Sequence, residues 1–243
     1  RSIEAAKRAL ALSAVPGKAT DLEKLYIASI AARRNESAKD PDAAYIAGLR
    51  AVIARHPGEV EAKTYLALHL MRGFTQPDKQ PRSGSTEAAE LLRQLLKEAP
   101  DHAGVHHYVI HGFEGSTFAK DAWPSCRRYP ELTPNIPHAL HMPGHIWAQT
   151  GRWDDAVASF DAAAKNELGY IHADKLYGTG HHGHNVLFLA ASYSFAGQYD
   201  TFLNIEGAAA VRTAVERCGQ ATDPLAAAVR AVVLDRAPSD GAA

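Results

Sequence analysis

The stretch GRWDDAVASFDAA, residues 151–163, decides the fold class. It follows the spacing Gly-x-Trp-x-x-Ala-x-x-x-Phe-x-x-Ala, which places Ala156, Phe160 and Ala163 on one face of a helix. A small residue on such a face lets two helices approach closely, and the aromatic residue one turn later fills the next layer of packing. The pattern therefore predicts a helix that buries this face against other helices.

The same spacing recurs at intervals of 34 residues. The equivalent positions are held by Ala122, Cys126 and Tyr129 one repeat earlier and by Ala88, Leu92 and Leu95 two repeats earlier, with partial copies at Tyr45, Leu49 and Val52 and at Gly197 and Tyr199. Pro100 and Pro134 follow their copies at one distance, and proline ends a helix. This period and spacing closely resemble the second half of a tetratricopeptide repeat, in which helical hairpins stack because none buries its apolar face alone.

We therefore predict an all-α, tetratricopeptide-like, right-handed superhelical solenoid that spans residues 1–243 as a single domain. About five helical hairpins and a capping helix account for the chain. The expected pairs are 22–33 with 43–55, 59–71 with 86–97, 104–115 with 118–128, 137–149 with 154–165, and 184–195 with 201–213, followed by a cap at 224–234. Insertions are expected near 73–85 and 167–183, the second of which would serve as a lid.

Composition excludes several classes of partner. Hydrophobic residues are 46% and charged residues 22%, as in a globular protein with a buried core. The net charge of −1 argues against a nucleic-acid partner, and no apolar run is long enough to predict a membrane partner. Cys126 and Cys218 form no Cys-x-x-Cys pair, which excludes a cysteine zinc cluster. The compartment is left open between the bacterial cytoplasm and export after removal of a signal peptide.

Histidine is the unusual residue type, with thirteen copies, of which eleven lie between His102 and His184. In a tetratricopeptide repeat the first helix of each hairpin lines the groove, and the histidines fall on those helices. In HHYVIHGFE, His111 is rotated about 40° from His107 around a helix, and Glu114 about 20° the other way. These three residues are therefore expected to project from one stripe, whereas His106 points elsewhere.

A second stripe is predicted in HALHMPGHI, where His141 is rotated about 60° from His138 and His145 about 20°. The next groove helix opens with HHGHN, which contributes His184, preceded by His181 and followed by Asn185. Neutral imidazole is a common ligand of transition metals, so these helices predict a site for one or two ions. Zinc or copper is favoured and iron stays open, whereas calcium and magnesium prefer oxygen ligands.

The segments HYVIHGFE and HALHMPGHIW, followed by GRW, also resemble a histidine-rich subgroup of bacterial tetratricopeptide-type proteins with the motifs HYxIHxx[DE] and HAxHMPSHI. The resemblance covers roughly residues 100–199 and departs from the pattern at Gly144, where serine is expected. It implies no single reaction. The pair His107-x-x-x-His111 has zinc-protease spacing, but Tyr108 stands where that motif has its glutamate base, so that activity is not expected.

Three functions are compatible with these residues. The favoured one is a metal-dependent enzyme, hydrolase or oxidoreductase, acting on a small molecule or peptide in the groove. Its predicted ligands are His107, His111, Glu114, His138, His141, His145 and His184, with Glu114 as ligand or catalytic base. A metal carrier, buffer or sensor would use the same ligands in a closed shell. A peptide-binding scaffold without metal is the third function.

Overall fold

The predicted helical architecture is confirmed in a computed structural model of the chain, which describes residues 2–174 and 178–196. Within those residues the secondary structure consists of ten α-helices and one short 3-10 helix, without strands. The chain divides into two compact units, Arg1–Thr117 and Phe118–Ala243, and each is described by itself. None of the described helices is both long and apolar enough to cross a membrane.

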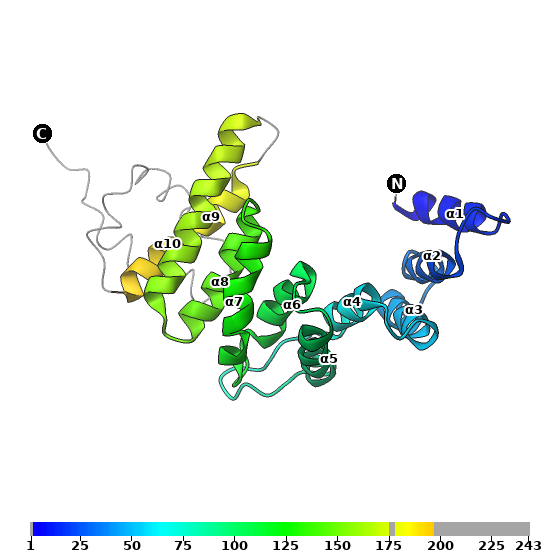
Figure 1. Cartoon of the computed structure of the whole chain (residues 1–243), viewed down its shortest axis with the longest axis horizontal. Coiled ribbons are helices and arrows are strands. Elements are labelled where there is room, and N and C mark those ends of the chain that lie inside the picture. The colour runs from blue at the N-terminus through cyan, green and yellow to red at the C-terminus, as the bar shows by residue number, and fades with distance from the viewer. Residues whose placement is uncertain (1, 175–177, 197–243) are drawn as a thin grey trace, which may run out of the picture. The chain divides into compact units, whose positions relative to one another are not determined.

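The first unit contains six helices in chain order (Figure 1). They are α1 (Ser2–Ser13), α2 (Asp21–Arg33), α3 (Pro41–Arg55), α4 (Val60–Leu70), α5 (Ser85–Glu98) and α6 (Ala103–Phe113). Two of the expected pairs are present, because α2 packs on α3 and α4 packs on α5. Helix α1, which packs on α2, was not predicted from the sequence.

Local signals set the beginnings of α2 and α3. The Thr20 side chain accepts a hydrogen bond from the backbone of Glu23, whose carboxylate accepts one from the backbone of Thr20, forming a capping box. Asp40 caps α3, and Pro41 occupies its first turn, where a missing N–H costs nothing. Gly48 of α3 lies so close to Ser29 of α2 that an added Cβ would stand 2.4 Å from the serine Cβ. This close approach requires a residue without a side chain.

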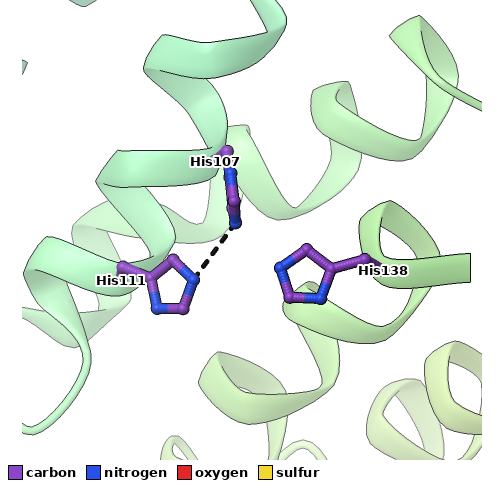
Figure 2. A group of neighbouring side chains, drawn as sticks. All are labelled: His107, His111 and His138. Carbon is purple, nitrogen blue, oxygen red and sulfur yellow. Dashed lines mark hydrogen bonds between the residues drawn. The ribbon is translucent and has the colours of Figure 1, made fainter. Parts of the chain in front are cut away.

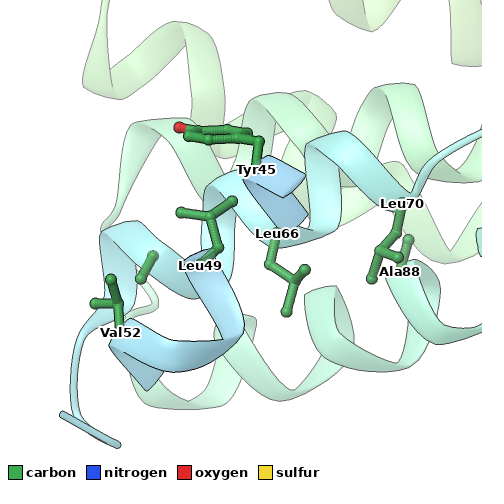
Figure 3. Packing of buried hydrophobic residues seen from close by; sticks show 7 residues of the cluster. Tyr45, Leu49, Val52, Leu66, Leu70 and Ala88 are labelled. Atoms are coloured by element: carbon green, nitrogen blue, oxygen red, sulfur yellow. The ribbon is translucent and has the colours of Figure 1, made fainter. Parts of the chain in front are cut away.

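The apolar core of the first unit is built from the predicted repeat positions (Figure 3). Tyr45, Leu49 and Val52 of α3 are buried together with Leu66 and Leu70 of α4. On α5 the repeat positions Ala88, Leu92 and Leu95 are also buried, with at most a trace of exposure. The residues that defined the 34-residue spacing are therefore the ones that hold these hairpins together.

The second unit contains the 3-10 turn η1 (Ala119–Ala122) and the helices α7 (Trp123–Leu132), α8 (Pro137–Gln149), α9 (Trp153–Ala173) and α10 (Gly180–Phe195). Helix α8 packs on α9 as predicted, and α9 packs in turn on α10 (Figure 1). The repeat residues of this unit, Ala122, Cys126, Tyr129, Ala156, Phe160 and Ala163, are all buried. Residues at the same repeat positions are thus buried between helices in both units.

The segment expected to be a second insertion is mostly helical instead. Helix α9 continues through residues 166–173, and α10 begins at Gly180, four residues earlier than expected. The first expected insertion is present as the non-helical connection 71–84 between α4 and α5. The helices expected at 201–213 and 224–234, together with Gly197, Tyr199 and Cys218, lie outside the described residues.

Candidate metal site

Helix α8 places its histidines on one stripe, as the spacing predicts. The rings of His138 and His141 have centroids 6.3 Å apart, and those of His141 and His145 are 4.7 Å apart. The Nε2 atoms of His141 and His145 lie 2.7 Å from each other. At that distance one nitrogen donates a hydrogen to the other, or both turn their lone pairs to a shared cation.

His184 of α10 joins this pair from the neighbouring helix. One ring nitrogen from each of His141, His145 and His184 lies within 4.8 Å of the other two. The ring centroids of His141 and His184 are 4.9 Å apart. The structure therefore brings these three predicted residues together, although they are separated in sequence by the whole of α9.

His141 is held in its neutral form by its surroundings. Its side chain is almost fully buried, with a relative exposure of 1%. Burial lowers its pKa to about 2, and the neighbouring rings of His145 and His184 act in the same direction. A neutral imidazole keeps a lone pair for a metal ion over the whole physiological range of pH.

Two phenylalanines form the apolar side of the site. The ring of Phe160, from α9, lies 4.9 Å from His141 between centroids, and the ring of Phe188, from α10, lies 4.8 Å from both His145 and His184. Gly144 makes the Phe160 contact possible, because a Cβ at that position would stand 2.4 Å from the Phe160 ring. Gly144, where the resemblance noted in the sequence leads one to expect serine, is therefore matched to this aromatic neighbour.

The buried carboxylate of Glu167, near the three-histidine group, was not predicted from the sequence. Glu167 of α9 is fully buried, and its two oxygens lie 2.5 Å from His181 Nδ1 and 2.5 Å from Asn185 Nδ2. His182 Nδ1 is 3.7 Å away, which is an ion-pair distance and too long for a hydrogen bond. The ring of His181 lies 5.7 Å from that of His184. Only the helical continuation of α9 would have placed Glu167 one turn beyond Ala163.

Helix α6, in the first unit, carries the other predicted pair. His107 and His111 project from one stripe with their Nε2 atoms 3.1 Å apart (Figure 2). Both side chains are at least partly accessible. The predicted angular relation of these two residues is therefore present.

Glu114 directly follows the last residue of α6. The helix ends at Phe113, and the ψ of 136° at Glu114 turns the chain out of the helix beyond it. The φ of −58° at Glu114 and the hydrogen bond of 3.1 Å from its N–H to the Ile110 carbonyl are those of a helix. Its role as ligand or base stays a prediction.

Two further histidines at or near α6 have other partners. His102 caps α6 by accepting a hydrogen bond from the backbone of Val105, and its Nε2 lies 2.9 Å from Glu61. The buried His106 lies 2.7 Å from the carbonyl of Pro100. His106 thus does not share the stripe of His107, as expected from the sequence.

The helical hairpins and the buried repeat residues define the chain as a tetratricopeptide-like, all-helical protein. Among solved structures it is similar to MamA. One MamA crystal structure matches with a TM-score of 0.55 and 13% identity, over 80% of this chain and 92% of that one. Another matches with a TM-score of 0.53 and 14% identity, over 73% and 88%. At these identities the likeness concerns the fold alone. No family model and no curated protein matches the chain.

Proposed function

We propose that this tetratricopeptide-like protein binds a transition metal at His141, His145 and His184. One observation carries the proposal: three imidazole nitrogens from two helices lie within 4.8 Å of one another beside a buried and neutral His141. A single histidine on a helix is usually part of the core or the surface. When three imidazole rings converge, binding one cation between them offsets the free-energy cost of removing their nitrogens from water.

The donor set fits a transition metal. Around a tetrahedral zinc ion with bonds of about 2.0–2.1 Å, ligand nitrogens stand about 3.3 Å apart. The observed 2.7 Å between His141 and His145 reaches that value after small side-chain rotations. Three nitrogens without a carboxylate favour zinc or copper, leave iron open, and disfavour calcium and magnesium.

Metal-dependent catalysis is the favoured use of this site. Three protein ligands leave a coordination position open, as in catalytic zinc sites. A bound metal would supply Lewis-acid or water-activating chemistry there. The chain's own contribution is to keep His141 neutral and to cover one side with Phe160 and Phe188, which exclude water. A carrier or sensor would use the same residues with that position filled by protein.

Protein or peptide binding is the second candidate function. The observation that favours it is the tetratricopeptide-like fold itself, which is the property shared with the MamA structures. Such a function needs no metal, so measuring whether the purified protein contains a metal distinguishes the two candidate functions. His107 and His111 of α6 are proposed as ligands of a further ion, and His138 as an additional ligand on α8.

The test is elemental analysis of the untagged protein, purified with and without added zinc or copper. We expect about one ion per chain to depend on His145, because His145→Ala removes a central donor of the three-histidine group. His172→Ala is the matched control, since His172 is exposed on α9 and outside the group. Absence of any stoichiometric metal after reconstitution would leave the peptide-binding scaffold as the better account. A parallel His107→Ala variant tests whether a further ion binds at His107 and His111 of α6.

A further inference from the structure

Glu167 is the most deeply buried charged group beside the metal site. Its carboxylate has no exposure, a position that is unfavourable unless hydrogen bonds compensate. Burial by itself would raise its pKa, but interactions with His182, Asn185 and His181 outweigh burial, and the net pKa is lowered. Asn185 Nδ2, which can only donate, and His181 Nδ1 each lie 2.5 Å from one of its oxygens, so the geometry places both carboxylate oxygens as acceptors.

This carboxylate dictates the tautomer of His181. Because Glu167 only accepts, the Nδ1 atom of His181, 2.5 Å away, must carry the hydrogen. In the neutral ring the lone pair then resides on Nε2, on the side of the ring away from Nδ1. The His181 ring lies 6.0 Å from His141, 5.7 Å from His184 and 5.9 Å from His138 between centroids. His181 is not among the residues whose ring nitrogens lie within 4.8 Å of one another, so it would reach an ion bound by the three-histidine group after a rotation of its side chain.

Asn185 extends the same control to His141. Its Nδ2 donates to Glu167, so its Oδ1 is left to accept. Asn185 Oδ1 and His141 Nδ1 are both buried, and neither has a hydrogen-bond partner among the described residues. The amide nevertheless lies close enough to His141 to oppose the lowering of its pKa. If His141 carries its hydrogen on Nδ1, that N–H can donate to Asn185 Oδ1 and give both atoms a hydrogen-bond partner. The lone pair of His141 is then on Nε2, the atom that faces His145.

We propose that Glu167 is the positioning residue of this site and that His181 is a fourth nitrogen ligand. The inference rests on the proposed metal-binding function, and with His181 bound an open position for catalysis requires a fifth coordination position, to which catalytic zinc sites can expand. Glu167 fixes His181 directly and His141 through Asn185, so that both rings present Nε2 as a lone pair before any ion arrives. Carboxylates and amides behind ligating histidines fix the tautomer and orientation of the ring in this way and raise its basicity.

The first experiment reads the tautomers without metal. Long-range ¹H–¹⁵N correlation spectra of the metal-free protein at pH 7.5 distinguish Nδ1–H from Nε2–H rings, and His181→Ala and His141→Phe identify the two signals. We expect His181 and His141 both to carry the hydrogen on Nδ1. Finding either ring as the Nε2–H tautomer would overturn the proposal even if the protein binds metal.

The second experiment measures zinc affinity by competition with a chelator and the visible spectrum of the cobalt-loaded protein. Glu167→Gln keeps the shape of the side chain but removes its charge, and we expect zinc to bind about 10–100-fold more weakly. His181→Ala should weaken zinc binding and shift the cobalt bands, because one nitrogen donor is lost. His172→Ala, on the same helix as Glu167, should change neither measurement.

The possible outcomes distinguish failure of this proposal from failure of the proposed metal-binding function. Wild-type protein that binds metal while His181→Ala keeps the wild-type affinity and cobalt spectrum would refute the fourth ligand and leave the three-histidine site intact. Wild-type protein without metal affinity would refute both. Weakened binding in Glu167→Gln together with an unchanged denaturation midpoint of the metal-free protein would support a positioning role over a structural one.

Discussion

His141 and His145 face each other across one turn of α8 with their Nε2 atoms 2.7 Å apart. In the metal-free protein a single hydrogen suffices to join them, and a cation can replace that hydrogen without moving the helix. In the proposed function a metal would take the place of that hydrogen. The pair lies at the contact between α8 and the aromatic side chains of α9 and α10.

Zinc should stabilise the wild-type protein more than the His145→Ala variant. An ion that binds only the folded state adds about 2.7 kcal/mol to the free energy of unfolding at one hundred times its Kd. We expect the thermal midpoint to rise with zinc in the wild type and in His172→Ala, and to rise less in His145→Ala, which lacks one of the three converging ligands. Differential scanning calorimetry with a chelator-treated sample as reference gives the shift. An equal rise in all three proteins would place the zinc elsewhere.

Gly144→Ser should destabilise the second unit, although serine stands at this position in the motif that the sequence resembles. A Cβ at this position would stand 2.4 Å from the Phe160 ring, so the ring must move or the helices must separate. Overpacking of this kind costs about 1–3 kcal/mol. Gly169→Ala is the control, because its Cβ would meet nothing within 4 Å and a mid-helix glycine is unfavourable. Urea denaturation should show the first variant losing stability and the second gaining about 0.5–1 kcal/mol.

Acid should destabilise the metal-free protein through His141. Its pKa is lowered from 6.5 in the unfolded chain to about 2 in the fold, mainly by burial. The folded state therefore binds fewer protons, and stability falls as the pH drops below about 6.5, by about 1.4 kcal/mol per unit for one group. His69, whose pKa is lowered by burial too, acts in the same direction. The pKa of Glu167 is lowered as well, so its contribution is lost only below its unfolded value of 4.5.

His141→Phe isolates that contribution. Phenylalanine keeps an aromatic ring against Phe160 and Phe188 but does not titrate, so the slope of unfolding free energy between pH 6.5 and 5 should become shallower than in the wild type. Guanidinium denaturation at several pH values in the presence of a chelator measures both slopes. Equal slopes in the two proteins would show that His141 is not the titrating group.

Cys126 should resist thiol reagents in the native protein. Its side chain is buried at a repeat packing position, and burial raises the pKa of its thiol to about 12. In a Cys218→Ser background, we expect Ellman's reagent at pH 8 to react only after denaturant is added. Rapid reaction without denaturant would mean that the α7 packing opens readily.

The sequence was most informative where spacing alone sets the packing. Ala156, Phe160 and Ala163 were predicted to share a buried face, and all three have no exposure in the structure. The histidine stripe on α8 followed from the same angular argument, because a continuous helix rotates by a fixed amount per residue. These properties depend only on neighbours within the helix, which the sequence displays directly.

Prediction was weaker where distant residues decide the structure. Residues 167–173 looked like an insertion, yet α9 continues through them, and Glu167 contacts His181 and Asn185 from the next helix. Helix α6 ends at Phe113, two residues before the end expected from the sequence. Buried hydrogen bonds between helices and the precise end of a helix are tertiary effects, and local pattern cannot supply them.

The three-histidine group joins α8 to α10 across the whole of α9. An ion held there would act as a reversible cross-link that closes a loop of about forty residues, and a cross-link of that span removes conformational freedom mainly from the unfolded chain. Cleavage of the backbone inside α9 would then leave both fragments tethered until the ion is withdrawn. The topology of the second unit would thus depend on ion supply, with a chelator acting on the chain as a reductant acts on a disulfide-bonded one.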